Sequence, residues 1–550
     1  MKRFCKYILL AATALSTASC SDFLETAPKD ALSPATTWKT QTDADKFLTG
    51  IYDGWEDPSA LLYWDAGSDI AYNNFSWEGF KGIANGTLSQ GNPGWSFYDF
   101  GTIRRVLEFL DNVDNCEFAS EAEKNNMKSQ ARFIQAYRYF IMNWNYGGVP
   151  LIKNFANAQE AMVPRNSEAE VRSFIETELD DIIDNNLINE TPAQRGRIAR
   201  GAVLALRMRE ALYYGDYAKA KECAEKIMSL GQYSLDPDFK NVFNIAGQGS
   251  PEIILAVNNL EVVKGLYTIG QLYNNGDGGW SSVVPTKNLI DMYEMSNGLT
   301  KDEPNSGYDP VHPYNNRDPR MAMTVIYPGR NYTKADGTTG IFNTLDKEID
   351  GATNANYYIA ADNASKTGLT WAKYLEPMTQ YNDIWSASCC PIVFRYAEVL
   401  LSYAEAANEV DGPTDKIYDC LDEVRQRVGM PVVDRAKYNT KDKLRELIHR
   451  ERTVELAGEG LRRADILRWK GSDGKPVANE VLNETLVRMV GTVSMDNSVP
   501  EGMRATIKTN PTEAEIKIED RKYNTWNRYL PIPDDALQAN RKLEQNDGYN

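Results

Sequence analysis

Apolar residues recur every three to four positions along several segments, the spacing typical of amphipathic helices. Two of these segments begin with a capping box, in which a serine and a glutamate three residues later satisfy the first backbone N–H groups. Ser120 begins one expected helix, which ends near Asn145 before Gly147, and Ser167 begins another. The second helix carries its apolar stripe on Val171, Phe174, Ile175, Leu179, Ile182 and Ile183.

The clearest pair of helices is expected in residues 200–231, with a turn at Gly215 and a cap at Asp216. A second, more degenerate pair is expected in residues 393–429, and a further long helix in residues 441–456. The helix–turn–helix spacing is similar to that of a tetratricopeptide unit. The pattern therefore predicts stacked helical pairs.

Two regions lack this periodicity. Residues 234–390 are rich in Gly, Asn, Asp, Thr and Tyr and contain only short strand-like runs, while residues 52–98 are irregular and strongly aromatic. Binding residues usually lie on such loops. We therefore predict a mainly α protein, a tetratricopeptide-like scaffold with large loop-rich insertions and a few short strands. The scaffold is expected mainly in residues 99–231 and 391–470, and the insertions in residues 52–98 and 234–390.

The N-terminus has the pattern of a secretory signal. A basic start is followed by a short apolar run and by small residues before Cys20, and the run is too short to span a bilayer. A cysteine at this point predicts a lipoprotein signal over residues 1–19, with Cys20 acylated; an ordinary secreted protein cut nearby is the alternative. Residues 20–39 then form a lipidated tether and residues 40–550 the folded domain.

Composition narrows the function further. The chain of 550 residues has a net charge of −17, which argues against nucleic acid, since phosphate binding needs a basic face. Five cysteines remain beyond the N-terminus, an odd and sparse set that does not suit a disulfide framework. These are expected as free thiols: Cys116, Cys223, Cys389, Cys390 and Cys420.

Motifs of common enzyme chemistry are absent from the sequence. The two histidines, His312 and His449, have no second histidine at metal-ligand spacing, and neither a G-x-S-x-G elbow nor a phosphate loop occurs. Paired carboxylates such as Asp180–Asp181 would suffice for glycoside cleavage, but they are expected as solvated surface. We therefore expect a protein that is not an enzyme. No cofactor is expected, although the Asn/Asp-rich loop 274–278 leaves structural calcium open.

Aromatic side chains in the insertions suggest a different chemistry. Flat rings flanked by Asn and Asp suit sugars, whose C–H faces stack while their hydroxyls form hydrogen bonds. A single tryptophan in such a region is more often buried as core, but we expect at least two of them to line a site. The candidate ligand-binding residues are Trp64, Asp69, Asn73, Trp77, Trp95, Trp280, Trp371 and Trp385.

Several longer segments are more specific. VFRYAEVLLSYAEAANE (393–409), LRELIHRERTVELAGEGLRRADILRW (444–469) and NRYLPIPDDALQANRKLEQNDGY (527–549) resemble the SusD/RagB family, as do QARFIQAYRYFIMNWNYGGVPL (130–151) and the CSDFLETAP start. The resemblance runs from end to end. It implies an outer-membrane lipoprotein on the extracellular face, built on four tetratricopeptide-like units. It also implies binding of glycans, or in some members peptides, and a SusC-like TonB-dependent transporter as partner.

The resemblance favours particular residues only in part. The segment 68–79 is similar to an early stretch near the family's ligand face, which favours Asp69, Asn73 and Trp77, whereas Trp95 and Trp280 follow by region alone. We expect capture of an oligosaccharide and its delivery to the transporter. The alternatives are a peptide-binding member of the family and a tetratricopeptide-type protein adaptor. Structural ion pairs are expected from Arg452, Glu455, Arg462, Arg463 and Asp465.

Overall fold

The computed structural model describes residues 37–154 and 157–549. The expected signal peptide and Cys20 lie outside the described residues. The packed part already includes Trp38, whose ring lies 4.3 Å from that of Phe47 and 6.0 Å from that of Phe109, measured between centroids. Residues 37–39, which the sequence suggested as the end of the tether, are therefore part of the fold.

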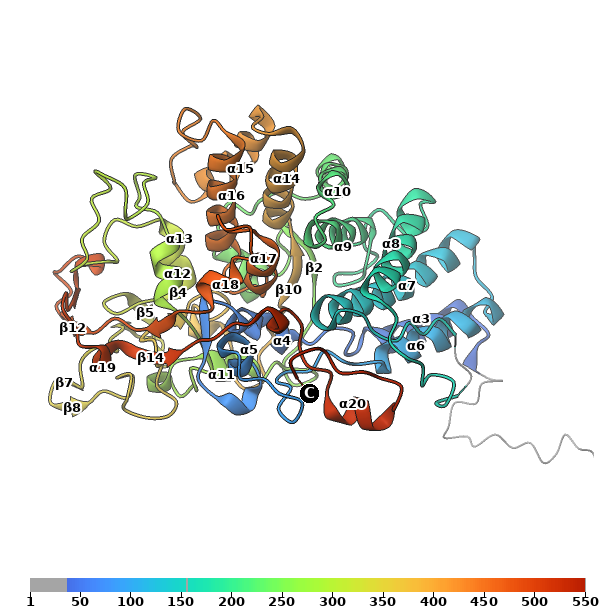
Figure 1. Cartoon of the computed structure of the whole chain (residues 1–550), viewed down its shortest axis with the longest axis horizontal. Helices are drawn as coiled ribbons and strands as arrows, with labels where there is room; N and C mark the ends of the chain where they lie inside the picture. Colours follow the sequence, from blue (N-terminus) through green and yellow to red (C-terminus); the bar gives the residue numbers. More distant parts are fainter. Residues whose placement is uncertain (1–36, 155–156, 550) are drawn as a thin grey trace, which may run out of the picture.

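Helices form most of the regular structure. Figure 1 shows α3 and α6–α10 at one end of the molecule, α14–α17 at its middle, and the segments that carry β5, β7, β8 and β12 at the other end. The longer helices are α3 (Gln41–Tyr52), α6 (Gly101–Asn112), α7 (Glu121–Tyr146), α8 (Glu168–Asp184), α9 (Arg200–Tyr213), α10 (Tyr217–Ser229), α14 (Tyr396–Asp411), α15 (Asp415–Arg427), α16 (Lys441–Leu456) and α17 (Arg462–Arg468). The shorter ones are α4 (Pro58–Tyr63), α5 (Lys81–Asn85), α11 (Thr268–Leu272), α12 (Lys287–Met292), α13 (Pro319–Thr324), α18 (Ala478–Val481), α19 (Glu513–Ile516) and α20 (Asp534–Ala539).

The predicted helical pairs are confirmed. Helix α8 begins with a complete capping box between Ser167 and Glu170, whereas at α7 only the Ser120 side chain accepts its hydrogen bond, from the N–H of Glu123. In the pair of residues 200–231, Asp216 accepts from the N–H of Lys219 at the start of α10. Local caps thus begin these helices where the sequence indicated.

The pair predicted in residues 393–429 differs at its start. Residues Ile392–Arg395 form strand β10, and helix α14 begins only at Tyr396. The run Ile392, Val393 and Phe394 is β-branched and aromatic, which favours a strand. The third helix of this block, α16, has the bounds that the sequence predicts.

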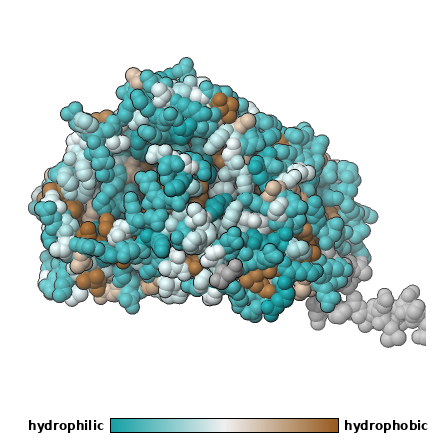
Figure 2. All heavy atoms as spheres, in the orientation of Figure 1, coloured by the Kyte–Doolittle hydropathy of each residue, from teal (hydrophilic) through white to brown (hydrophobic). Residues whose placement is uncertain are grey.

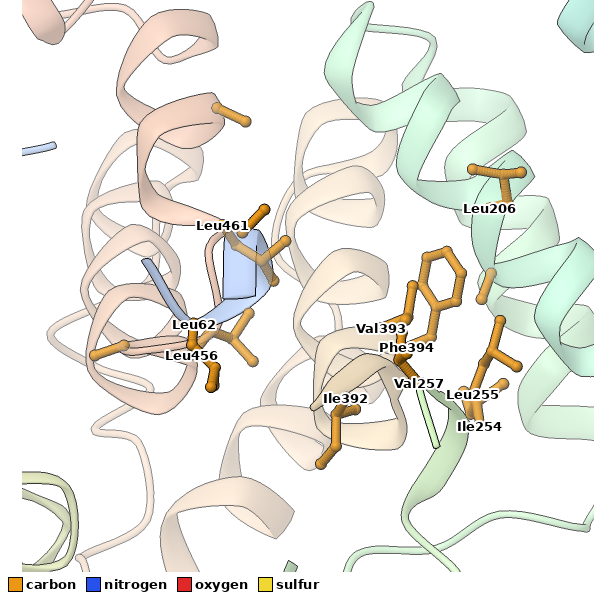
Figure 3. Packing of buried hydrophobic residues seen from close by; sticks show 14 of the residues in the cluster. Leu62, Leu206, Ile254, Leu255, Val257, Ile392, Val393, Phe394, Leu456 and Leu461 are labelled. Carbon is orange, nitrogen blue, oxygen red and sulfur yellow. The ribbon is translucent and has the colours of Figure 1, made fainter. Parts of the chain in front are cut away.

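The described strands are short and pair antiparallel, two by two. The pair β2–β10 lies in the core, where Figure 3 shows Val393 and Phe394 of β10 beside Ile254 and Leu255 of β2. The strands are β1 (Ala71–Asn73), β2 (Ile253–Ala256), β3 (Val283–Pro285), β4 (Val325–Ile326), β5 (Asn331–Thr333), β6 (Thr339–Ile341), β7 (Glu348–Ile349), β8 (Ala352–Thr353), β9 (Thr370–Trp371), β10 (Ile392–Arg395), β11 (Thr485–Val487), β12 (Gly491–Val493), β13 (Ala505–Ile507) and β14 (Lys517–Asp520).

A buried network of charges joins the large insertion to the scaffold. Glu455 of α16 forms ion pairs with Arg395 of β10, Arg427 of α15 and Arg320 of α13. Burial alone would raise the pKa of Glu455, but the surrounding guanidinium groups lower it well below its usual range. The network therefore holds α13, which lies in the insertion, against the helical block.

The expected structural ion pairs are confirmed, with one difference. Arg452 pairs with Asp465 over 2.9 Å inside the helical block. Arg463, in contrast, donates to the backbone carbonyls of Gly67 and Asn527, each over 2.9 Å, and its pKa is lowered to about 10 by burial. Arg463 thus fixes backbone rather than a carboxylate.

The remaining expectations concern thiols and surface. The five cysteines of the described residues are free and buried, as the sequence predicted. In the part of the chain that the structure describes, no helix combines the length and the apolar character that crossing a membrane requires. Figure 2 shows one face of the molecule, which is largely hydrophilic with small scattered hydrophobic patches.

Candidate functional site: an exposed aromatic cluster

Five aromatic rings from three distant segments meet at the surface. We call Phe75, Trp77, Tyr267, Trp280 and Trp385 the aromatic cluster. Their ring centroids lie 4.8 to 6.3 Å apart along the series of contacts. Trp77 is 67% exposed and Tyr267 49% exposed, while the other three are half-buried. A contiguous group of partly exposed rings is typical of a binding surface, whereas single exposed rings are common.

A short antiparallel ladder brings two of the tryptophans together. Asn73, the last residue of β1, lies opposite Val283, the first residue of β3. The chain therefore leaves β1 and enters β3 at the same end of the ladder, which places Trp77 beside Trp280. Their rings meet edge to face, with 6.3 Å between centroids and 72° between planes.

Trp385 reaches the cluster through a second antiparallel contact. Leu266 and Ala387 form a β-bridge, which places Tyr267 and Trp385 next to each other with 4.8 Å between ring centroids. Gly270 of α11 makes room for the indole, since a Cβ atom there would lie 2.5 Å from the ring of Trp385. The absence of a side chain at Gly270 thus sets the position of Trp385.

A buried carboxyl group lies beneath the exposed rings. Glu78 accepts hydrogen bonds from Asn73 Nδ2 over 2.5 Å, from Gln271 Nε2 over 3.2 Å and from the Tyr63 hydroxyl over 3.4 Å. Burial raises its pKa, while hydrogen bonds from Ser282 and Asn73 lower it again in part. Glu78 therefore ties the segment after β1 to α11 and fixes the base of the aromatic cluster.

The structure assigns Asp69 and Asn73 to the interior. Both oxygens of Asp69 accept from the guanidinium of Arg462, and the carboxylate is fully buried. Asn73 is 1% exposed, and its amide bonds Glu78 and the Ser282 carbonyl while its oxygen accepts from the N–H of Lys81. Since every polar atom of these two side chains has a partner in the protein, we leave both out of the ligand-contacting set.

Three further candidate tryptophans lie away from the aromatic cluster. Trp371 in β9 is 3% exposed and contributes to the core. Trp95 stacks on Phe80 with 5.1 Å between centroids, and Trp64 packs edge-on against Phe97 at 4.7 Å. Trp64 and Trp95 both contact Phe80, three residues after Trp77, and thus support the segment that carries Trp77.

Sequence reasoning missed two members of the aromatic cluster. Phe75 lies two residues before Trp77, and this short spacing could have predicted that the two rings lie close together. Tyr267 gave no such signal, because its position depends on the bridge between Leu266 and Ala387, which are far apart in the chain.

A hydrophobic hairpin lies beside the cluster. Leu260 and Lys264 form its closing bridge, and the N–H of Glu261 donates to the hydroxyl of Ser388 over 2.9 Å, close to Trp385 in the sequence. Val262 and Val263 at its tip are 90% and 80% exposed. Val262 has a φ of 70°, a left-handed conformation that is strained for a β-branched residue. The hairpin thus keeps a strained, exposed tip.

The loop 274–278 is held by its own hydrogen bonds. Asn274 donates to Asp277 over 2.8 Å and accepts from its backbone N–H, and the other Asp277 oxygen accepts from the N–H of Ala335. Across residues 37–154 and 157–549, no group of three or more His, Cys, Asp or Glu side chains is arranged to hold a metal ion. The structure therefore provides no further support for calcium in this loop.

A paired-helix scaffold that carries an exposed aromatic cluster is typical of a ligand-binding protein. The model of the SusD family matches residues 237–549, more than half of the chain, and the chain therefore belongs to the SusD family.

Similar proteins cover nearly the whole chain. The SusD-like protein P25 of Formosa agariphila is 25% identical over 477 residues, which cover 82% of this chain and 87% of that protein. The starch-binding protein SusD of Bacteroides thetaiotaomicron is 23% identical and covers 80% of this chain and 75% of its own length. The crystal structure of a SusD-like carbohydrate-binding protein from Bacteroides fragilis superposes with a TM-score of 0.78 at 27% identity, over 92% of this chain and all of that structure.

Proposed function

We propose that this protein binds an oligosaccharide at the aromatic cluster and is not an enzyme. The observation that carries the proposal is the arrangement of Trp77, Trp280 and Trp385, whose planes are tilted by 72° and 54° along the series. Tilted rings present their faces in different directions, which suits a bent chain of sugars, since each ring can stack on the C–H face of a different sugar residue. Relatives named for carbohydrate or starch binding support the ligand class.

The proposal extends to where the ligand goes. Acylation of Cys20 would anchor the protein in the outer membrane, because two or more acyl chains hold a protein stably at about 0.8 kcal/mol per buried CH₂. From the extracellular face, the protein would deliver its oligosaccharide to a SusC-like TonB-dependent transporter. Family membership supports this partner.

Calorimetric titration with a panel of neutral and acidic oligosaccharides tests the ligand. In a protein that binds one of them, Trp77→Ala should weaken binding by about tenfold, the loss expected for one aromatic contact. Trp526→Ala is the matched control, because Trp526 is 43% exposed but belongs to a different part of the surface. Equal loss in both variants, or binding of peptides in place of all glycans, would overturn the proposal.

A second experiment tests the transporter. Co-purification of the full-length lipoprotein with the SusC-like protein from outer membranes should depend on Cys20, because anchoring concentrates the two proteins in one plane. Cys20→Ala should release the protein from the membrane and leave glycan binding by the purified chain intact. Retention of Cys20→Ala in the outer membrane would contradict the anchor.

A further inference from the structure

Three basic side chains form a second feature next to the aromatic cluster. We call Lys81, Lys366 and Arg488 the cationic cluster. Lys81 lies at the start of α5, Lys366 in the large insertion and Arg488 directly after β11. Lys81 and Arg488 both lower the pKa of Lys366, although burial is the larger cause and Asp362 acts in the opposite direction. The three positive charges thus lie within electrostatic reach of one another.

These cations have neutral oxygen partners. Lys81 Nζ donates to the hydroxyl of Tyr72 over 2.9 Å, Lys366 Nζ to the carbonyl of Ala361 over 2.9 Å, and an Arg488 terminal nitrogen to the carbonyl of Lys517 over 2.6 Å. None of the three forms an ion pair with a carboxylate of residues 37–154 or 157–549.

Aromatic rings and unfilled donors complete this surface. Lys81 lies over the ring of Tyr72 at 5.1 Å, and the guanidinium of Arg488 lies over the ring of Tyr358 at 4.5 Å. The Nε of Arg488 is buried and has no hydrogen-bond partner among the described residues. Desolvation lowers the pKa of Arg488, and no carboxylate offsets this effect. Repulsion between unpaired cations is costly, so an anion bound among them is favourable.

One asparagine connects the two clusters. Asn74 Nδ2 donates to the carbonyl of Ser281, next to Trp280, over 2.7 Å, and to the carbonyl of Ala364, close to Lys366, over 3.3 Å. Trp77 precedes Lys81 by four residues of the same segment. A chain of sugars that stacks on the aromatic cluster can therefore extend over the cationic cluster.

We propose that the cationic cluster binds a sulfate ester or a carboxylate of the oligosaccharide that stacks on the aromatic cluster, so that the ligand is an acidic glycan. This inference rests on the proposed function and names its ligand class. Arg488 offers a planar fork that matches either oxyanion, while the two lysines act as point charges around it. Sulfated and uronate glycans share this chemistry, and the experiment must distinguish them.

Calorimetry on the purified protein compares each acidic ligand with its neutral counterpart. The probes are sulfated galactan oligosaccharides with their desulfated forms, and oligogalacturonates with their methyl esters. We expect one acidic form to bind at least about tenfold more tightly than its neutral counterpart, the effect of one charge-assisted hydrogen bond. The preference should shrink between about 50 mM and about 500 mM salt, since salt screens the attraction. A preference for the sulfated galactan identifies a sulfate ester as the bound group, and a preference for the oligogalacturonate identifies a carboxylate.

Variants assign the preference to the cationic cluster. Arg488→Gln and Lys366→Gln should each reduce the discrimination between the acidic ligand and its neutral counterpart, and Lys81→Gln with Arg488→Gln should abolish it. Lys443→Gln is the control, because Lys443 is exposed on α16, away from both clusters. Melting temperatures of all variants verify folding, and Lys366→Gln alters an insertion loop outside the helical scaffold.

The outcomes separate this inference from the proposed function. Equal binding of the acidic and neutral forms contradicts the proposal that the ligand is acidic, while the proposal of glycan binding remains supported. Full discrimination in the Lys81→Gln, Arg488→Gln double variant overturns the assignment to these residues. Failure of every glycan to bind overturns the proposed function, and the inference with it.

Discussion

Both carboxylate oxygens of Asp69 accept hydrogen bonds from the guanidinium of Arg462, each over 2.9 Å. The pair is buried and joins the first loop-rich insertion to helix α17. A buried charge that loses its partner is strongly unfavourable, whereas exposed pairs contribute little. The pair therefore fixes the segment that leads into the aromatic cluster.

Asp69→Asn should destabilise the protein by about 3–5 kcal/mol, because it leaves Arg462 buried without its paired carboxylate. Urea unfolding measures the loss. Asp53→Asn is the matched control, since Asp53 forms an exposed ion pair with Lys264, and its removal should cost less than about 1 kcal/mol. Unchanged stability of Asp69→Asn, with loss of glycan binding alone, would return Asp69 to the ligand-contacting set.

Gly270→Ala should displace the Trp385 indole, because the added Cβ would lie 2.5 Å from ring atoms. We expect glycan binding to weaken by roughly 0.5–1.5 kcal/mol, the contribution of one aromatic contact, with little change in the melting temperature. Calorimetry and tryptophan fluorescence measure the two effects. Gly249→Ala is the control, since no heavy atom lies within 4 Å of the added carbon there. Binding that resists Gly270→Ala would remove Trp385 from the site.

Acid should weaken the helical block through Glu405. Burial raises the pKa of Glu405, but the ion pair and hydrogen bonds with Arg468 outweigh it and lower the pKa from its ordinary value of 4.5 to about 2. A folded pKa below the unfolded one means that this stabilisation is complete above about pH 4.5 and is lost as the pH falls toward 2.

The Glu405→Gln variant isolates this titration. It should be less stable than the wild type at pH 6, and the difference should narrow by about 2 kcal/mol at pH 3, because Glu405 of the unfolded wild type is then protonated while that of the folded form still mostly is not. Urea unfolding at the two pH values measures the difference. A constant difference would show that Glu405 does not titrate in this range.

Val262→Asn should stabilise the protein. The left-handed conformation costs a β-branched residue roughly 1–2 kcal/mol more than it costs asparagine, and the 90% exposed side chain gives up little packing. We expect a gain of about 1 kcal/mol in unfolding free energy. Val263→Asn, at a neighbouring exposed position without positive φ, should show no gain. Equal effects in both variants would indicate a general effect of polarity.

The helices could be predicted from the sequence because their signals are local. Ser167 and Glu170 are three residues apart, and the apolar stripe of α8 repeats within single turns. Strand β10 was missed because Val393 and Phe394 continue directly into the helical pattern of α14. Only its pairing with β2, far away in the sequence, determines its conformation.

The candidate site could be predicted only as a set of residue types. Trp371 and Trp385 both lie in loop-rich sequence. Trp371 is nevertheless buried in a strand, whereas Trp385 packs against Gly270 at the surface. The meeting of Trp77 and Trp280 depends on three-residue strands, which are too short for a recognisable alternation. Long-range pairing, which local sequence does not encode, therefore decided which rings became exposed.

The late position of Glu455 and Arg462 in the chain has a consequence for biogenesis. Among the described residues, Asp69 in the first insertion forms its ion pair only with Arg462, whereas Arg320 in the large insertion pairs locally with Asp318 and additionally with Glu451 and Glu455. A chain that emerges on the far side of a membrane from its N-terminus onward would therefore leave Asp69 without its partner, and Arg320 without two of its three partners, until this segment arrives. The segment that leads into the aromatic cluster would then be fixed only after residue 462 has emerged, and a chain that ends before this residue would lack the pair that fixes it.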